Sequence, residues 1–277
     1  MKLVHFFRYD NGKYHEFSLI HYISIRSFLI CCPEVEVILW MNIEPYDSIW
    51  YHQLMEEFPD RIKVDLAAMT KDKSEKWIDN FNCISHFIDW FKLKVLYNAG
   101  GLSVDTDVIA LKDCTWMIDD KVGYIAGERD PLSHKFTQIA LGIASFPVKC
   151  EFVDEWFKLF NEEYYQGAKW TEFSGKRPTE LLNDNRERFS NIKVLPESLI
   201  DPVTYTRDAL ADLFLHNRIS FKSSYMIHVS ESIAWDRYLK PLDLEHIMTV
   251  DTVFTKTVRP FVSHLWDASK CAPVIRV

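Results

Sequence analysis

Short strand-like runs alternate with helical stretches along the first 66 residues of the chain. The runs at 3–7, 34–40 and 62–66 are rich in β-branched and aromatic residues, and the stretches at 15–29 and 46–58 carry apolar residues at helical spacing. The second run becomes continuously apolar, which is typical of a strand buried on both faces. Strands that alternate with helices in this way form a mostly parallel sheet covered by helices, so we predict a Rossmann-like α/β fold.

A further helix is predicted over 84–97, because apolar residues recur there on one face. The pair Gly100-Gly101 follows it, and glycine readily adopts the positive φ at which helices commonly end. A short apolar strand at 102–104 then leads directly to Asp105-Thr106-Asp107. Ligands in open α/β sheets collect beyond the carboxyl ends of strands, so these two carboxylates lie where ligand chemistry is expected.

The remainder of the chain shows a weaker pattern. Strands are predicted at 123–126, 140–146, 192–195 and 225–229, and an amphipathic helix at 151–164. The stretch from Pro241 onward has no clear periodicity. Because the sequence contains no internal repeat and no linker rich in Pro or Gly, we predict a single domain over residues 1–277.

Charge and composition limit the classes of partner. The 277-residue chain has a net charge of −8 with its basic residues dispersed, so it lacks the basic patch of a nucleic-acid-binding protein and we expect no nucleic-acid partner. Hydrophobic residues make up 48% and charged residues 26% of the chain, as in ordinary globular proteins. An acidic protein can still bind a diphosphate when a divalent cation supplies the positive charge.

The cysteines and the amino terminus bear on the compartment. The six cysteines include no C-x-x-C pair and no histidine at the spacing of a structural zinc site, so we expect reduced thiols. The first residues enter a strand-like run directly and lack the long apolar stretch of a signal peptide or membrane anchor. We therefore expect a cytoplasmic protein without an integral membrane segment, and peripheral attachment to a membrane stays open.

The carboxylate pair is a candidate metal site. Two carboxylates two residues apart on an extended segment point to the same side, so Asp105 and Asp107 can reach one Mg²⁺ or Mn²⁺, directly or through a water. A bare D-x-D is common by chance in a chain with 40 acidic residues, and a solvated loop is the ordinary explanation of such a match. The helix, the Gly-Gly break and the apolar strand that precede this pair favour a ligand site.

The segment around this pair resembles the core of the DXD sugar-transferring glycosyltransferases. It consists of Ile88-Asp89-Trp90-Phe91-Lys92 and, after a short gap, the residues from Leu96 to Val108. In the family pattern an S-D-x-x-R segment precedes G-G-x-Y-x-D-x-D, and Asp89 lies sixteen residues before Asp105, as that pattern requires. The family has the GT-A fold and retains anomeric configuration. It includes capsular polysaccharide enzymes, mannosyltransferases and, more distantly, the clostridial glucosylating toxins.

The resemblance implies a role for each matched residue. Asp89 is expected to accept hydrogen bonds from donor-sugar hydroxyls, Asp105 to contact the sugar or ribose and a metal-bound water, and Asp107 to bind the Mn²⁺ or Mg²⁺ itself. Lys92 stands where the family usually has Arg, and it keeps the charge but lacks the planar two-pronged geometry of a guanidinium. Ser103 stands where Tyr is common, so its contact to the nucleotide is expected to be smaller or supplied elsewhere.

Weaker similarities extend over most of the chain. The opening strand at 2–7 is similar to the K-I-I-H strand of the family, and Arg8 replaces a Trp often found there, so Phe7 or Tyr9 is expected to stack on the base. The segments at 33–40 and 194–196 resemble the N-P-x-Y-x-x-x-L-W strand and a late V-L-P segment, and they mainly support the fold.

The segment at 225–235 resembles the closing H-x-x-x-S-W region, where the family completes its metal site. His228 is therefore a candidate third metal ligand, although a histidine on a strand is more often a hydrogen-bonded structural residue. Trp235 either closes over the donor diphosphate or anchors the carboxyl-terminal segment. The predicted donor-binding residues are Phe7, Tyr9, Asp89, Lys92, Gly101, Ser103, Asp105 and Trp235.

The resemblance implies a metal-dependent hexosyltransferase with a nucleotide-sugar donor, which is UDP-hexose in most of the family. Residues 1–115 would bind the donor, and residues 116–277 would supply the acceptor side and the last part of the metal site. The acceptor would be a glycan, a lipid-linked molecule or a protein, contacted by variable loops such as 167–178. Attack on the same face as the departing diphosphate would retain configuration. Lys92 and Arg129 are candidates to offset the charge of the diphosphate.

Two alternatives stay open at this point. The segment from Asp105 to Val108 also fits the D-x-D nucleophile motif of haloacid-dehalogenase-like phosphatases, although the Gly-Gly break and a position past residue 100 are unusual for that class. The departures from the family pattern at Arg8, Lys92 and Ser103 are also compatible with a sugar-nucleotide-binding protein of weak catalysis.

Overall fold

The computed structural model describes residues 2–10, 16–66, 84–130, 133, 135–160 and 171–267. Its strands are β1 Lys2–Arg8, β2 Val35–Met41, β3 Ile62–Asp65, β4 Gly101–Val104, β5 Val108–Ala110, β6 Gly123–Arg129, β7 Phe136–Phe146, β8 Ile192–Leu195 and β9 Met226–His228. Its α-helices are α1 Leu19–Cys31, α2 Ile49–Glu57, α3 Ile84–Ala99, α4 Glu151–Leu159, α6 Arg177–Asp184, α7 Glu197–Ile200, α8 Arg207–Leu215, α9 Glu231–Ala234, α10 Leu244–Thr249 and α11 Val253–Val258.

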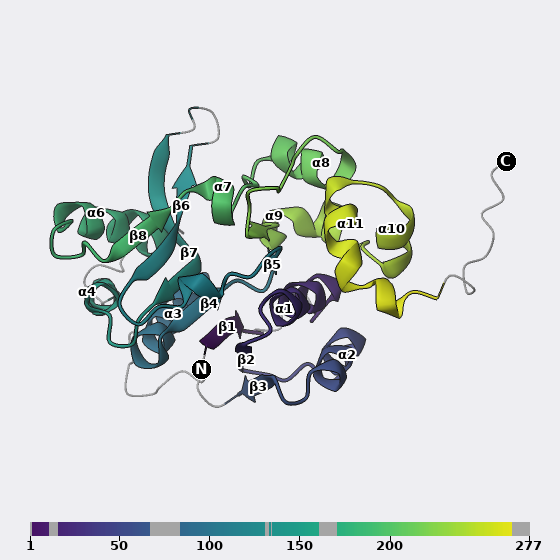
Figure 1. Cartoon of the computed structure of the whole chain (residues 1–277), viewed down its shortest axis with the longest axis horizontal. Coiled ribbons are helices and arrows are strands. Elements are labelled where there is room, and N and C mark those ends of the chain that lie inside the picture. The colour runs from purple at the N-terminus through teal and green to yellow at the C-terminus, as the bar shows by residue number, and fades with distance from the viewer. Residues whose placement is uncertain are drawn as a thin grey trace.

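A seven-stranded sheet in the order β3-β2-β1-β4-β7-β6-β8 forms the centre of the fold, with helices on both sides (Figure 1). Within this sheet β7 pairs antiparallel with β4 and β6, and the other pairings are parallel. The remaining six strands therefore run in one direction, and their carboxyl ends meet at one edge. The second sheet of the described residues is the antiparallel pair of β5 and β9.

The predicted alternation of strands and helices is confirmed. The three predicted runs in the first 66 residues are β1, β2 and β3, and the two helical stretches between them are α1 and α2. Helix α1 begins at Leu19, later than predicted, because the backbone N–H of Ser18 is already satisfied by the side chain of His21. His15, the first residue of that predicted helix, lies outside the described residues.

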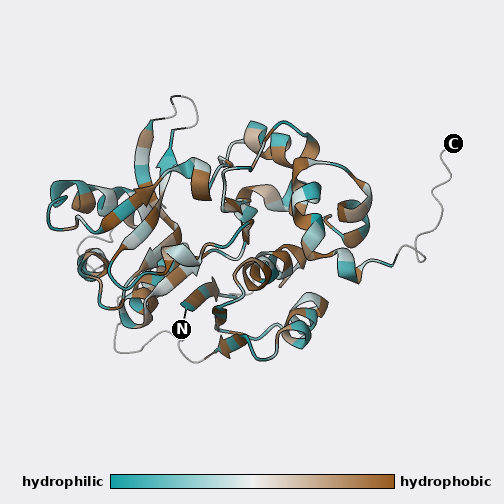
Figure 2. Cartoon of the chain, viewed as in Figure 1, coloured by the Kyte–Doolittle hydropathy of each residue, from teal (hydrophilic) through white to brown (hydrophobic). Residues whose placement is uncertain are grey.

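Strand β1 is buried on both faces, as expected of a central strand. Val4 and Phe6 belong to one apolar cluster, which also contains α1 and the carboxyl-terminal helices, while Phe7 belongs to the other, with α3 and α4. Figure 2 shows the hydrophobic colour concentrated along β1 and α1, whereas the outer helix α6 mixes both colours. The sheet thus separates two cores, and helices cover each of them.

His5 forms two hydrogen bonds in the middle of this sheet. Its Nε2 lies 2.9 Å from the carbonyl oxygen of Gly100, and its Nδ1 accepts a hydrogen bond of 3.1 Å from the indole N–H of Trp40. Burial lowers the pKa of His5 to about 4, against the hydrogen bond to Gly100, so the ring is neutral at pH 7. This histidine joins β1, β2 and the turn before β4.

The Gly-Gly break has the predicted conformation. Helix α3 ends at Ala99, and Gly100 and Gly101 follow with φ of 64° and 93°. A Cβ at Gly101 would lie 2.7 Å from the carbonyl oxygen of Leu3, so no larger residue fits there without a shift of β1. Because of this break, the chain passes directly from helix α3, on one face of the sheet, into the central strand β4.

The later predictions differ from the structure mainly in length. The predicted strands at 123–126 and 140–146 are the ends of longer strands, β6 and β7. The helix predicted over 151–164 is α4, which ends at Leu159, and residues 161–164 lie outside the described residues. The stretch from Pro241 forms the short helices α10 and α11. Every helix in the described ranges is too short or too polar to cross a lipid bilayer.

Candidate functional site

Asp105 occupies the turn between β4 and β5, at the carboxyl edge of the sheet. Its backbone N–H donates to the carbonyl of Gly142 on β7 at 2.9 Å, and its own carbonyl accepts from the N–H of Val108 at 3.1 Å. A Cβ at Gly142 would lie 2.9 Å from the carboxylate oxygen Oδ2 of Asp105. Because Gly142 has no side chain, the carboxylate of Asp105 has room above β7.

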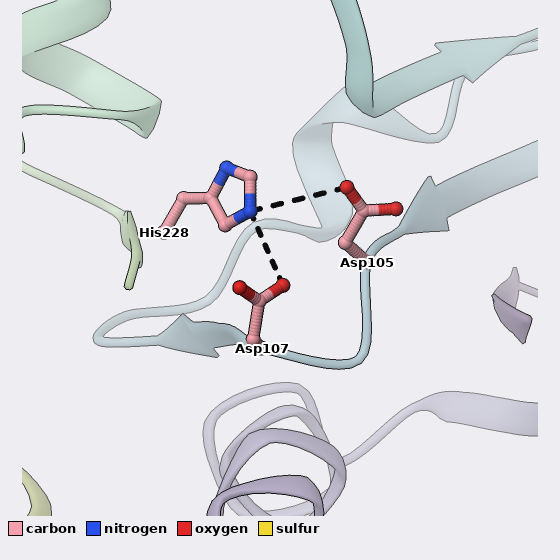
Figure 3. Close-up of side chains that lie close together, drawn as sticks. All are labelled: Asp105, Asp107 and His228. Carbon is pink, nitrogen blue, oxygen red and sulfur yellow. Dashed lines mark ion pairs between the residues drawn. The ribbon is translucent and has the colours of Figure 1, made fainter. Parts of the chain in front are cut away.

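The small sheet brings His228 to the carboxylate pair. Val108 pairs with His228 in the antiparallel register of β5 and β9, and the N–H of Val229 donates to the carbonyl of Asp107. As a result the imidazole Nε2 lies 3.1 Å from Oδ1 of Asp107 and 3.9 Å from Oδ2 of Asp105 (Figure 3). One ligand atom from each of the three residues lies within 4.8 Å of the others.

Asp107 is held in place by the residues after β9. Ser230 has a φ of 53°, a left-handed conformation that is uncommon for a residue with a side chain, and it turns the chain into α9. The N–H of Glu231, the first residue of α9, then donates to Oδ2 of Asp107 at 2.6 Å. Oδ1 of Asp107 is left facing His228.

The charges of Asp107 and His228 depend on each other. Burial would lower the pKa of His228, but the charge and hydrogen bonds of Asp107 and Asp201 outweigh it and raise that pKa well above its ordinary value. Burial would raise the pKa of Asp107, but His228 and the N–H of Glu231 lower it. In the metal-free protein a protonated imidazole therefore balances the carboxylates.

These three residues fit a divalent cation. Two carboxylates and one imidazole that converge on a single point form a donor set suited to Mn²⁺ or Mg²⁺, with the remaining positions left to water or ligand oxygens. A cation held there would take over the balancing role of the imidazole proton.

Lys92 connects helix α3 to the end of β4. Its Nζ lies 2.5 Å from Oδ1 of Asp105 and 3.5 Å from Oδ1 of Asp89, one turn earlier on the same helix. Burial would lower the pKa of Lys92, but the charges of Asp105 and Asp89 outweigh it and raise that pKa. The pKa of Asp89 is raised, because burial and the charge of Asp105 together outweigh the charge of Lys92. Lys92 is thus a buried cation with a carboxylate on each side.

A cavity of about 560 Å³ opens beside these residues at the carboxyl edge of the sheet. Lys92, Arg129 and His228 are the basic side chains in its lining. The acidic side chains in the lining are more numerous: Asp89, Asp105, Asp107, Glu128, Glu197, Asp201 and Glu231. The cavity therefore has an excess of negative charge.

Four of these carboxylates were not predicted as site residues: Glu128, Glu197, Asp201 and Glu231. Glu128 is near the end of β6, and Glu197 and Asp201 begin and follow α7, directly after β8. Burial, helped by the charge of Asp201, raises the pKa of Glu197 to about 7. Burial also raises the pKa of Asp201, against the effect of His228. Glu128 lies near the carboxyl end of β6, and Glu197 and Asp201 lie beyond that of β8, so the signal that singled out Asp105 points to them as well.

The predicted donor-binding residues divide into two groups. Phe7, Asp89, Lys92 and Asp105 line the cavity together, as does Arg129. The other four predicted donor-binding residues lie outside its lining: Tyr9, Gly101, Ser103 and Trp235.

Each residue of the second group has a visible structural contact. The Tyr9 ring packs edge-on against Phe87 at 5.2 Å, Gly101 lies against the β1 backbone, and Trp235 packs beside one of the apolar clusters. Ser103 is fully buried within the sheet. Of the predicted acceptor loop at 167–178, residues 167–170 lie outside the described residues, while Thr171, Ser174 and Gly175 line the cavity.

Comparison with protein families gives one match. Residues 21–123 match the model of a family described as "Glycosyltransferase sugar-binding region containing DXD motif". The matched range contains Asp89, Lys92, Asp105 and Asp107, and it ends at the first residue of β6, before β8 and β9. Among curated protein sequences, none matches the chain significantly.

Solved structures similar to this chain have the GT-A fold. The glycosyltransferase GlyE of Streptococcus pneumoniae TIGR4 aligns with a TM-score of 0.53 and 13% identity over 96% of this chain and 65% of its own. The galactosyltransferase LgtC, solved in complex with donor and acceptor sugar analogs, aligns with a TM-score of 0.53 and 12% identity over 93% and 95% of the two chains. The predicted fold class is thereby confirmed. This chain spans slightly less than two thirds of the GlyE chain.

Proposed function

We infer that this glycosyltransferase, which carries a DXD-containing sugar-binding region on a GT-A fold, transfers a hexose from a nucleotide sugar with the help of a divalent cation. The proposed donor is a UDP-hexose, and the acceptor is a glycan, a lipid-linked molecule or a protein. Transfer proceeds with retention of configuration. The chain acts as one domain, in which residues 1–115 bind the donor and residues 116–277 supply the acceptor side and His228.

One observation carries the proposed metal dependence. The diphosphate of a nucleotide sugar carries two negative charges, and the cavity already holds more carboxylates than basic side chains. A diphosphate would be repelled from such a cavity unless a cation accompanied it. Asp105, Asp107 and His228 converge as a donor set for that cation, which is Mn²⁺ or Mg²⁺.

The cation supplies positive charge that stabilises the departing nucleoside diphosphate without a protein acid. The chain itself holds and orients the donor. Lys92, fixed between Asp89 and Asp105, cannot swing freely, so it keeps the Asp105 carboxylate directed along the cavity wall. Asp89 accepts hydrogen bonds from sugar hydroxyls, and Phe7 stacks on the base.

The remaining donor contacts of the proposal need local movement or act indirectly. Trp235 and Tyr9 would have to turn toward the cavity to touch the donor, because neither lines it in the free protein. Gly101 and Ser103 support the donor site through the position of β4. Arg129 at the end of β6 offsets charge on the diphosphate from the opposite wall.

Acceptor attack is proposed on the same face as the leaving diphosphate, through an oxocarbenium-like state. Retention has a direct readout, since the anomeric configuration of the product can be read from its proton NMR coupling constants. A product of inverted configuration would remove this part of the proposal and leave the metal-dependent donor site intact.

The function is tested by incubating the full chain with a panel of UDP- and GDP-hexoses, each with Mn²⁺, with Mg²⁺ and with EDTA. We expect release of the nucleoside diphosphate from at least one UDP-hexose with a metal, and loss of that release with EDTA. Binding of a donor without turnover would favour the sugar-nucleotide-binding alternative.

The phosphatase alternative is not favoured by the family match or by the fold. The same samples test it with p-nitrophenyl phosphate in place of the sugar nucleotide. Phosphate release from that compound, with no release of nucleoside diphosphate from any sugar nucleotide, would overturn the proposed function.

A further inference from the structure

Asp201 and the carboxylate pair lie on opposite sides of the His228 ring. Nε2 of the imidazole faces Asp107 at 3.1 Å, whereas Nδ1, across the ring, lies 3.6 Å from Oδ2 of Asp201. One ring nitrogen is therefore directed at the metal-binding residues and the other at a carboxylate that lies outside the ligand set. The two nitrogens of a neutral imidazole differ, because one carries the proton and the other the lone pair that binds metal.

The backbone fixes Asp201 relative to His228. Helix α7, which Asp201 follows, is tied to the segment just before β9: Leu199 accepts a hydrogen bond of 2.6 Å from the N–H of Tyr225, and Ser198 accepts one of 2.8 Å from the hydroxyl of Ser224. The N–H of Asp201 itself donates to the carbonyl of Glu197 at 2.8 Å. The carboxylate of Asp201 and the imidazole of His228 thus lie close to two segments that are hydrogen-bonded to each other.

The surroundings of Asp201 disfavour the ionised form of its carboxyl group. Its side chain is 19% exposed, its Oδ1 has no hydrogen-bond partner among the described residues, and the negative charges of Glu197, Glu128, Asp105 and Asp107 all act on it. The imidazole of His228 is the group that compensates it. A residue needed only for packing would be better served here by a neutral side chain of the same size.

We propose that Asp201 is a positioning residue that holds the proton of His228 on Nδ1, so that Nε2 offers its lone pair to the cation bound by Asp105 and Asp107. A carboxylate that accepts the second N–H of a metal-binding histidine fixes the tautomer and the ring orientation, and removal of such a partner typically weakens metal binding by about 10- to 100-fold. The inference rests on the proposed function, because it assumes that the cation site is real.

The first test is a Mn²⁺ titration of the full chain in the presence of UDP, with the free Mn²⁺ followed by electron paramagnetic resonance. We expect Asp201→Ala to weaken Mn²⁺ binding by about 10- to 100-fold, while Asp201→Asn keeps binding within about fivefold, because an amide oxygen can still accept from Nδ1–H. The titration is run at pH 8, where Glu197, with a pKa of about 7, is mostly ionised. Glu197→Gln is then the matched control, since it removes a neighbouring cavity carboxylate that is not among the ion-pair partners described for His228. We expect it to change the affinity by less than about threefold.

The second test reads the tautomer of His228 in the wild-type protein directly. In the chain labelled with ¹⁵N-histidine and loaded with Mg²⁺, the side-chain nitrogen shifts of His228 are assigned by comparison with His228→Gln. We expect the wild-type protein to show the proton on Nδ1 alone, and Asp201→Ala to show a mixture of tautomers. A wild-type spectrum with the proton on Nε2 would overturn the proposal even if Asp201→Ala does not fold.

The outcomes separate this inference from the proposed function. If the wild-type chain binds Mn²⁺ but Asp201→Ala binds it equally tightly, Asp201 does not position His228 and the metal-dependent site stands. If the wild-type chain binds no Mn²⁺ in the presence of UDP, the proposed cation site itself is wrong. An equal loss in Asp201→Ala and Glu197→Gln would assign the effect to the net charge of the cavity and overturn the positioning role.

Discussion

The two walls of the cavity differ in how their charges are compensated. On the wall formed by α3 and the β4 end, Lys92 forms an ion pair with both Asp89 and Asp105, so one buried cation holds two carboxylates. On the wall formed by the ends of β6 and β8, Gln138 donates a hydrogen bond to Glu128 and the charge of Arg129 acts on Glu197. None of the described residues forms an ion pair with either carboxylate, and burial raises the pKa of each. The carboxylates of the first wall already have an ion-pair partner in the free protein. The second has negative charge available for a ligand, which suits hydroxyl or cationic groups of an acceptor.

This difference separates what each wall does in the proposed reaction. A wall whose charged side chains already form ion pairs is ordered before any ligand arrives, as a donor site that must hold a sugar in one orientation requires. A wall whose carboxylates have no ion-pair partner is less stable alone and gains from binding a hydrogen-bond donor. The predictions below test the two walls separately, from the largest expected effect to the smallest.

Asp107→Asn removes the charge through which the donor wall would hold the cation. We expect metal-dependent release of nucleoside diphosphate to fall by at least about 10³-fold, because the charge stabilisation of the leaving group is lost with the cation. The measurement is initial-rate UDP release at saturating Mn²⁺. Activity within about tenfold of the wild-type protein would show that Asp107 does not hold a catalytic metal.

Lys92→Ala removes the cation that pairs with Asp89 and Asp105 on the donor wall, which is the wall formed by α3 and the β4 end. It leaves Asp89 and Asp105 near each other without their cation, so we expect the free energy of unfolding at pH 7 to fall by about 3–5 kcal/mol, as measured in urea. The control is Lys92→Arg, which restores the charge and introduces the residue usual in the family. We expect it to recover most of the stability and activity. A stable, fully active Lys92→Ala would contradict the claim that Lys92 holds Asp89 and Asp105 in place.

Glu128→Gln combined with Glu197→Gln alters only the other wall. Loss of charged hydrogen-bond acceptors should weaken the contact with an acceptor, so we expect transfer to fall by about 10-fold or more while donor hydrolysis changes by less than about twofold. The two rates are compared on the same enzyme preparation. Equal losses in both rates would place these carboxylates in the donor site instead.

Glu197→Gln alone should change the pH dependence of stability. The pKa of Glu197 is raised to about 7 in the folded protein, while in the unfolded chain it lies near 4.5, so the unfolded state releases its proton first. The wild-type protein therefore loses stability as the pH rises from about 4.5 through 7. We expect the variant to lack this loss and to melt about 2 °C higher than the wild-type protein at pH 8, with little difference at pH 4.

The contrast between the two walls also explains which parts of the site could be predicted from the sequence. Asp89 and Lys92 lie on α3, and Asp105 and Asp107 lie in the turn after β4, the next strand, so their short separation in sequence keeps them close in space. Helical periodicity and the Gly-Gly break predicted Asp105 and Asp107 at the edge of the sheet, and the resemblance to the glycosyltransferase family added Asp89 and Lys92. His228 was identified from a motif, and the register of β5 with β9 brings it to the pair.

The other wall was not predicted, for a topological reason. Glu128 and Glu197 approach each other because β6 pairs in parallel with β8, and more than 60 residues separate these strands in sequence. A pattern of apolar residues identifies strands but does not say which of them are neighbours. The short helices α10 and α11 escaped prediction because six residues are too few to show helical periodicity.

The most direct test of the central claim is calorimetric binding of UDP to the full chain, with and without Mn²⁺. Because the cavity carries an excess of carboxylates, a diphosphate should bind only together with the cation. We predict measurable UDP binding with Mn²⁺, and none at the same concentrations with EDTA. UDP binding of equal affinity in EDTA would contradict a donor site built on Asp105, Asp107 and His228.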